Sequence, residues 1–230
     1  MRILLKLSGE ALAGPKKTGF DEETVRGVAL QVKKIAADNE VEIVIGGGNF
    51  WRGRTSENID RVKADQIGML ATVMNCIYVS EIFRSVGLDT EIMTPFACSS
   101  FTKLFSKDEA VKALKAGKVV FFAGGTGHPY FSTDMGTVLR AIETEAEAVL
   151  LAKSIDGVYD DDPATNKNAK KYDKVSLQEL VQKGLKVVDT PASALALENK
   201  MPFMVFDLNE ENSIVNALTG KFNGTRVYVD

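Results

Sequence analysis

Short apolar runs alternate with amphipathic stretches from one end of the chain to the other. Nearly continuous apolar runs are typical of strands in a covered parallel sheet, and they occur at 3–5, 41–45, 119–123 and 148–152. Shorter runs at 91–94, 203–206 and 226–229 resemble them. Between the runs, apolar residues recur with helical spacing, as over 22–38. This alternation predicts a parallel sheet with helices on both faces.

Polar residues before the amphipathic stretches indicate where helices begin. Asp21 is expected to cap the helix over 22–38, and Thr190, followed by Pro191, a helix that runs to 198. Capping boxes are predicted at two further helix starts, Ser106 with Glu109 and Ser176 with Glu179.

A long helix is expected over 62–86, and its middle is apolar on most sides. Such a helix is buried in a core or covered by another subunit, so we expect the chain to assemble through it. The apolar run at 67–79 contains Gly68 and Asn75 and is too short to span a bilayer, so no membrane association is expected.

Composition narrows the functional classes. The chain has 230 residues, which suits a single domain over 1–230, and its net charge of −3 argues against a broad nucleic-acid surface. Two cysteines, Cys76 and Cys98, are too few for a disulfide framework, and one histidine, His128, is too few for a histidine metal site. The first residues lead directly into a strand without a signal peptide, so we expect a cytoplasmic protein.

Candidate chemistry gathers where the predicted strands end. Lys6 with Ser8 and Gly9 follows the first strand, and glycine-rich loops at 46–53, 124–134 and 153–163 follow others. Glycine turns with Lys6, Arg52 and Lys153 among them suit phosphate groups and a divalent cation. Neither a P-loop nor a dinucleotide fingerprint is present.

Three acidic positions have structural alternatives at this point. Asp134 could be catalytic or could cap a helix, and the position of Asp65 is that of a solvated carboxylate in a first helical turn. The run 160–162 could hold a metal, or it could form a solvated turn before Pro163.

Together the loops resemble the bacterial uridylate (UMP) kinases of the amino acid kinase superfamily, over essentially the whole chain. The resemblance rests on five motifs in the family's order: Lys-Leu-Ser-Gly-Glu-Ala-Leu at 6–12, Gly-Gly-Gly-Asn at 46–49 with Arg52-Gly53, Gly-Met-Leu-Ala-Thr-Val-Met-Asn at 68–75, Gly-Thr-Gly at 125–127 with Pro129, Thr133 and Asp134, and Asp-Gly-Val-Tyr at 156–159 with Asp162-Pro163.

The resemblance implies a fold and a reaction. The fold is an α/β three-layer αβα sandwich with a mainly parallel central sheet, with the acceptor site in the N-terminal part and the ATP site in the C-terminal part. The reaction is transfer of the ATP γ-phosphoryl group to UMP, giving UDP and ADP in pyrimidine nucleotide biosynthesis, with Mg²⁺ as cofactor.

The matching positions imply the site residues. Lys6 and Asp134 would be catalytic, and Asp134 would orient the lysine or hold Mg²⁺ on the ATP phosphates. The ATP set is Lys6, Leu7, Ser8, Gly9, Gly48, Arg52, Lys153, Ser154, Tyr159 and Asp162. The UMP set is Gly47, Asp65 (at the ribose), Thr126, Gly127, His128, Pro129, Tyr130, Phe131, Ser132 and Thr133.

The resemblance also implies an oligomeric state and regulatory nucleotides, and alternative functions stay open beside it. Its bacterial members are commonly homohexamers that UTP inhibits and GTP activates. Arg84 is the main basic residue in the region of a GTP site, where the family has a larger basic set, so GTP activation is not expected. The resemblance leaves UTP inhibition open. Family members usually carry asparagine where His128 stands, which leaves its role open. An acetylglutamate- or carbamate-type kinase and a nucleotide sensor without turnover remain alternatives.

Overall fold

The computed structural model describes residues 1–51, 58–185, 187–219 and 221–229. Nine strands in this part of the chain form one sheet, in the order β4-β3-β5-β2-β1-β6-β10-β11-β9. Their bounds are β1 Arg2–Leu7, β2 Glu40–Ile45, β3 Thr90–Thr94, β4 Lys103–Leu104, β5 Val119–Phe122, β6 Ala148–Lys153, β9 Lys174–Ser176, β10 Phe203–Asp207 and β11 Thr225–Tyr228. All pairs are parallel except β10 with β11. A separate antiparallel hairpin joins β7 (Val158–Tyr159) to β8 (Lys171–Tyr172).

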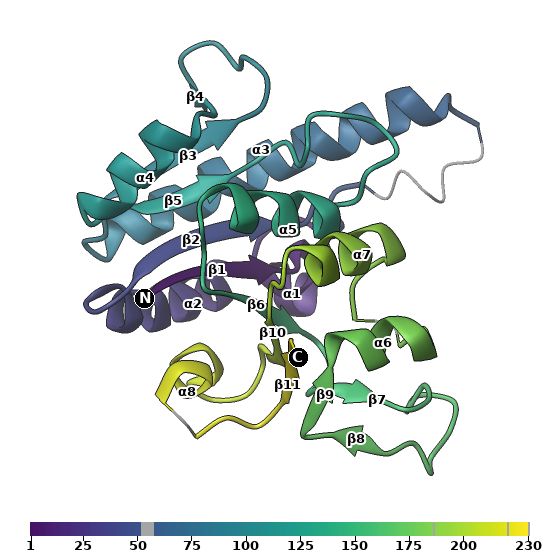
Figure 1. The fold of residues 1–230 in the computed structure, drawn as a ribbon. Coiled ribbons are helices and arrows are strands. Elements are labelled where there is room, and N and C mark those ends of the chain that lie inside the picture. Colours follow the sequence, from purple (N-terminus) through teal and green to yellow (C-terminus); the bar gives the residue numbers. More distant parts are fainter. Residues whose placement is uncertain (52–57, 186, 220, 230) are drawn as a thin grey trace.

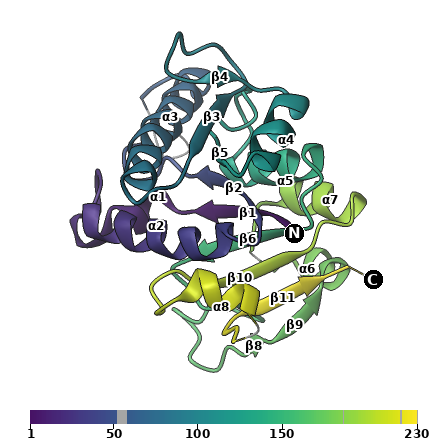
Figure 2. The same cartoon turned by 90° about the vertical axis from the view of Figure 1, so that its left-hand side faces the viewer.

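Helices cover both faces of the sheet, as the alternation of patterns predicted (Figures 1 and 2). On one face lie α2 (Glu22–Ala36), α3 (Arg61–Ser85) and α8 (Ser213–Thr219). On the other lie α4 (Lys107–Lys115), α5 (Thr133–Glu143), α6 (Leu177–Lys183) and α7 (Thr190–Glu198). The short helices α1 (Gly9–Leu12) and η1 (Gly14–Lys16) follow β1. The expected three-layer αβα sandwich is therefore confirmed.

Strand residues alternate between the two cores that the helices close. Ile3 and Leu5 of β1 face α2 and α3, whereas Leu4 faces the opposite core. Because both faces are covered, every one of these side chains is apolar and fully buried. Lys6 shares the parity of Leu4, so its side chain rises on the face that carries α5 and α7.

Two of the four predicted helix caps are confirmed. Asp21 caps α2 by accepting from the Thr24 N–H, and Ser176 caps α6 by accepting from the Glu179 N–H. Two cap predictions are wrong. Asp189, one residue before Thr190, caps α7 through the Ala192 N–H, and the Ser106 side chain makes no capping bond to α4. Thr190 is already helical because Pro191 fits the first turn of a helix.

Helix α3 is the one helix in the described residues whose length and composition would allow it to cross a membrane. Of the most apolar 18-residue window of α3, 44% is buried inside the protein. Cys76, Val79 and Phe83 of this helix pack on the sheet. Four other apolar side chains of α3, Ile67, Leu70, Met74 and Ile77, form a stripe and are 37% to 53% exposed.

One carboxyl group is buried inside the sheet itself. Glu42 of β2 is completely inaccessible, and its Oε2 accepts a hydrogen bond of 3.0 Å from Thr144 Oγ1. Its Oε1 has no hydrogen-bond partner among the residues that the structure describes. Burial raises the pKa of Glu42 to about 8, against smaller opposing effects of Thr144 and Arg2. Glu42 is therefore largely protonated at neutral pH.

Candidate functional site

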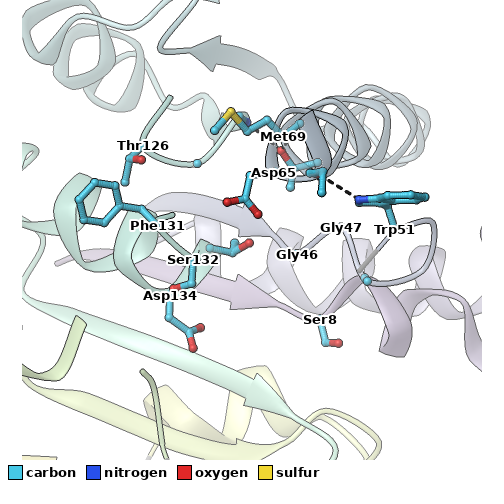
Figure 3. Close-up of a pocket in the computed structure, with 18 of the residues that line it drawn as sticks. Ser8, Gly46, Gly47, Trp51, Asp65, Met69, Thr126, Phe131, Ser132 and Asp134 are labelled. Carbon is cyan, nitrogen blue, oxygen red and sulfur yellow. Dashed lines mark hydrogen bonds between the residues drawn. The ribbon is translucent and has the colours of Figure 1, made fainter. Parts of the chain in front are cut away.

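A cleft of about 330 Å³ opens where β1, β2 and β5 end. Its walls come from the turn after β1, the Gly46–Gly48 loop, the first turns of α3 and the loop 124–134 (Figure 3). In a parallel sheet these carboxyl ends meet at one edge, which is where ligands bind in open α/β folds. The topology therefore brings together loops that are distant in sequence.

The centre of the cleft is an ion pair between two neighbouring elements. Lys6 Nζ, from β1, lies 2.7 Å from Asp134 Oδ1, from the first turn of α5. Both side chains are mostly buried, at 16% and 20% exposed. Ser132 caps α5 by accepting from the Met135 N–H. Of the two roles open for Asp134, capping is therefore excluded, and its carboxylate is directed to Lys6.

A second lysine completes a charged cluster around Asp134. Burial raises the pKa of the Asp134 carboxyl, but Lys6, Lys153 and the Asp189 backbone N–H together lower it below its ordinary value. Lys153 stands at the end of β6, and its ammonium donates to the Val187 carbonyl. Burial lowers the pKa of Lys153, and Asp134 partly opposes that effect. Asp134 is thus ion-paired with Lys6 and lies within electrostatic range of a second lysine, an arrangement with more cationic than anionic side chains that suits an anion.

Glycine is required at two positions, one in the turn after β1 and one in the loop after β2, where these segments contact their neighbours. A β-carbon on Gly9 would lie 2.3 Å from the Gly46 carbonyl oxygen, and one on Gly47 would lie 3.0 Å from the Gly68 carbonyl oxygen. The turn after β1, the loop after β2 and α3 are therefore in direct backbone contact. Glycine turns that approach one another this closely are typical of loops that bind anions.

The opposite wall of the cleft is built on α3. Asp65 Oδ2 accepts from Arg61 Nε at 2.8 Å and from the Tyr130 N–H at 2.8 Å. The Asp65 side chain is only 13% exposed, so it is not a freely solvated carboxylate. Asp60, not Asp65, caps the helix. Trp51 Nε1 donates to the Ala64 carbonyl at 2.9 Å and holds the preceding loop on the same turn (Figure 3).

The loop 124–134 divides its residues between the cleft and the surface. Thr126, His128, Phe131, Ser132 and Thr133 line the cleft. The predicted residues Gly127, Pro129 and Tyr130 do not line it. Tyr130 is 66% exposed with a φ of 72°, and its ring lies under the Arg61 guanidinium, 5.4 Å from the centroid.

A second cleft of about 380 Å³ lies beside the first, between β6, the β7 hairpin and the loop after α6. Lys153, Tyr159 and Asp162 line it, as do Gly157 and Leu185. Tyr159 Oη donates to Asp156 Oδ1 at 2.7 Å, which fixes the ring against the hairpin. Lys153 is the residue that connects the two clefts, because it lines the second and interacts with Asp134 of the first.

The remaining predicted positions fall outside these walls. The side chain of Leu7 is buried in the core, and Ser154 is exposed beside the second cleft without lining it. Arg52 lies outside the described residues. Of the two open roles for residues 160–162, Asp161 and Asp162 hold a turn through Asn166 and the Ala164 N–H. The described residues contain no group of three acidic, histidine or cysteine side chains that could hold a metal.

Polar residues on α3 were not predicted as part of the site. Thr72 Oγ1 accepts from the Gly124 N–H at 2.8 Å, and Asn75 Nδ2 donates to the Gly46 carbonyl at 2.7 Å. One helix therefore holds both glycine loops. The available signal was the presence of these two polar residues in the otherwise apolar run at 67–79.

Comparison with known proteins agrees with this geometry. The model of the amino acid kinase family matches residues 1–207. The UMP kinase of Bacillus anthracis is 36% identical, with 100% of this chain and 96% of that chain covered and a TM-score of 0.95. The UMP kinase of Ureaplasma parvum is 35% identical, with 99% and 98% covered and a TM-score of 0.95. The uridylate kinase of Archaeoglobus fulgidus is 26% identical, with 99% and 100% covered and a TM-score of 0.77. The chain therefore belongs to the amino acid kinase family, and within that family it groups with the UMP kinases.

Proposed function

We propose that this protein is a UMP kinase that transfers the γ-phosphoryl group of ATP to UMP and releases UDP and ADP. The observation that carries the proposal is the Lys6–Asp134 pair at 2.7 Å in the first cleft, within electrostatic range of Lys153, which lines the second. Two substrates that exchange a phosphoryl group need adjoining sites with positive charge at their junction. The reaction would supply UDP to pyrimidine nucleotide biosynthesis.

The two clefts suggest one site for each nucleotide. We assign the adenosine of ATP to the second cleft, beside Tyr159 and Asp162, with its phosphates extending past Lys153 toward the first. Lys6 and the N–H groups of Ser8, Gly9 and Gly48 are assigned to those phosphates. Leu7 and Ser154 line neither cleft. The side chain of Leu7 is buried in the core, so it can contact ATP only through its backbone atoms.

UMP is assigned to the first cleft. Asp65 would accept hydrogen bonds from the ribose hydroxyls once it exchanges the Tyr130 N–H for ligand, and Gly47 would approach the phosphate. The cleft-lining side chains Thr126, His128, Phe131, Ser132 and Thr133 would surround the nucleoside. In the same loop, Gly127, Pro129 and Tyr130 shape the backbone rather than the wall.

In the proposed reaction, a phosphate oxygen of UMP bonds to Pγ of ATP while the bond from Pγ to the β–γ bridging oxygen breaks. The bonding electrons leave with ADP. The attacking group is already an anion, so no general base is needed. The protein's contribution is alignment and neutralisation of charge on the transferring group. Lys6 and Lys153 supply positive charge; Asp134 holds the Lys6 ammonium, and the Val187 carbonyl accepts from the Lys153 ammonium.

The donor set fits Mg²⁺ carried by ATP. Mg²⁺ is usually bound by one or two carboxylates together with substrate phosphates, and Asp134 is a carboxylate that lines the cleft beside Lys6. When bound, Mg²⁺ neutralises charge on the phosphate oxygens. Asp134 would hold it directly or through water.

A coupled assay of ADP release tests the proposal. We expect turnover with ATP and UMP, and much less with CMP. Turnover with acetylglutamate or carbamate in place of UMP would assign the chain to another activity of the same family. Binding of ATP and UMP without any ADP release would identify a nucleotide sensor.

We also propose a homohexamer in which the stripe of Ile67, Leu70, Met74 and Ile77 on α3 meets a second copy. These residues follow one another at helical spacing and are exposed, as a subunit contact requires. A concentration-independent mass near 25 kDa by light scattering would contradict any oligomer. UTP, which carries the uridine of UMP, is proposed as an inhibitor. GTP activation is not proposed, because Arg84 already bonds to Thr90 and Glu81.

A further inference from the structure

Two buried asparagines form a reciprocal amide pair beneath the glycine loops. Asn75 Nδ2 donates to Asn49 Oδ1 at 2.8 Å, and Asn49 Nδ2 donates to Asn75 Oδ1 at 2.9 Å. Asn75 is completely buried and Asn49 is 3% exposed. Each amide makes one more bond to the backbone: Asn75 to the Gly46 carbonyl at 2.7 Å, and Asn49 to the Gly19 carbonyl at 2.8 Å. The pair therefore ties α3 to two loops at once.

The pair is in contact with the turn that follows β1. A β-carbon on Gly9 would lie 2.3 Å from the Gly46 carbonyl oxygen and 2.4 Å from Asn49 Oδ1. Those are the two oxygen atoms that accept hydrogen bonds from Asn75 Nδ2. The single amino group of Asn75 thus fixes both surfaces on which Gly9 rests. There is no free space at this contact, so a shift of either oxygen moves the turn.

We propose that Asn75 is a positioning residue for phosphoryl transfer, acting through Asn49 and the Gly46 carbonyl to set the spacing between the Ser8–Gly9 turn and the Gly46–Gly48 loop. The inference rests on the proposed function, in which Ser8, Gly9 and Gly48 hold the ATP phosphates and Gly47 approaches the phosphate of UMP. Asn75 lines neither cleft, so it acts on the nucleotide only through its neighbours. In-line transfer is sensitive to such spacing, since a misplacement of about 1 Å can cost roughly 10²-fold in rate.

A purely structural role makes a different prediction. Buried amides that satisfy backbone groups stabilise the fold wherever they occur, and removing one lowers the melting temperature without changing the kinetics of the folded enzyme. Ser80 provides a matched control on the same helix. It is 1% exposed, and its Oγ bonds to Thr90 Oγ1 at 2.8 Å, away from both clefts. Ser80→Ala removes a buried hydrogen bond of α3 without touching the glycine loops.

The test compares Asn75→Ala, Asn49→Ala and the double variant with Ser80→Ala. Each is measured for melting temperature, for kcat and the KM values of ATP and UMP, and for affinity for a non-hydrolysable ATP analogue. We expect both single asparagine variants to lose roughly 10- to 100-fold in kcat. Their analogue affinity should also fall, by more than the change in the KM of UMP. The loss in kcat of the double variant should be no larger than that of the more impaired single variant, because both substitutions remove the same hydrogen-bond network.

Ser80→Ala should lower the melting temperature and leave every kinetic constant within about twofold of wild type. Folded Asn75→Ala with wild-type kcat and analogue affinity would overturn the proposal, as would losses that simply multiply in the double variant. If Asn75→Ala does not fold, Asn49→Ser is measured in its place. This milder variant keeps the hydrogen bond from Asn75 to the Gly46 carbonyl and breaks only the link through Asn49. Unchanged kinetics in Asn49→Ser would then overturn it.

Failure of the proposed function would be visible separately. If the wild-type protein does not phosphorylate UMP, the function is wrong. The affinity of each variant for the ATP analogue still reports on whether Asn75 positions the phosphate turns.

Discussion

Asp134→Asn separates charge from shape at the junction of the two clefts. Asparagine has nearly the same size as aspartate and can still accept from the Asp189 N–H, but it carries no charge. Ser132 caps α5, so the substitution leaves the cap in place. Lys6 and Lys153 would then stand close together without a counter-ion. We therefore expect a folded protein whose active centre is electrostatically unbalanced.

The expected kinetic effect is a loss of roughly 10²- to 10³-fold in kcat, the scale for removing one preorganised electrostatic contact. ATP binding should survive, because the two ammonium groups remain available to its phosphates. Mg²⁺ dependence should change, since Asp134 is the proposed carboxylate for the metal. The assay is coupled ADP release across a Mg²⁺ titration, with analogue binding measured alongside. Wild-type kcat and Mg²⁺ dependence in the folded variant would refute the assigned role.

Stability gives an independent measure of the same pair. Breaking a buried ion pair costs about 3–5 kcal/mol, and we expect roughly 1–3 kcal/mol here because both side chains retain some exposure. The folded pKa of Asp134 lies below its ordinary 3.8, so the stabilisation is present above pH 3.8 and is lost as the pH falls through the folded value. The difference in unfolding free energy between wild type and variant should be constant from pH 8 to 5 and disappear in stronger acid.

Three further predictions test other groups. Lys6→Ala should fold and lose roughly 10²-fold or more in kcat, and near-normal kcat would reject its role at the transferring phosphate. Asp65→Ala should raise the KM of UMP, leave that of ATP nearly unchanged, and reduce a UMP-over-dUMP preference of roughly one to two orders of magnitude in kcat/KM, because a hydrogen bond to a charged group contributes about 1.5–3 kcal/mol. An unchanged ratio between the two substrates would remove Asp65 from the ribose site. The pKa of Glu42 rises from 4.5 to about 8 on folding, so wild-type stability should decline by about 1.4 kcal/mol per pH unit across that interval. Glu42→Gln should abolish the decline in urea unfolding measured between pH 5 and 8, and a slope equal to that of wild type would contradict the buried protonated state.

The long elements of the fold could be predicted from the sequence because their patterns are local. The spacing of apolar residues located α2 within two residues at its end, and the apolar runs located β1, β2 and β6. The two-residue strands β4, β7 and β8 were missed, since a pair of residues shows no periodicity. The error at Thr190 has a local cause as well: Asp and Thr are both good caps, and neighbouring positions compete.

The residue types of the site could be predicted from the sequence, but the contacts between their side chains could not. Glycine turns and lysines at strand ends indicated phosphate chemistry, but the 2.7 Å contact between Lys6 and Asp134 depends on β1 and α5 meeting in space. Asn75 was missed for the same reason. Its partners are 26 and 29 residues away, and no local pattern distinguishes a positioning amide from an ordinary buried one.

The central position of β1 also sets an order of events during synthesis. Strand β1 is made before both of its neighbours, β2 on one side and β6 on the other, and the Arg2 N–H donates to Glu147 across 145 residues of chain. At 5–20 residues per second, the partner for that second edge follows after roughly 7 to 29 seconds. Until then the edge that will carry Lys6 exposes unpaired backbone groups to association with other chains. Nascent chains that stall before β6 should therefore depend on chaperones, and nucleotide cannot rescue them, because its binding site does not yet exist.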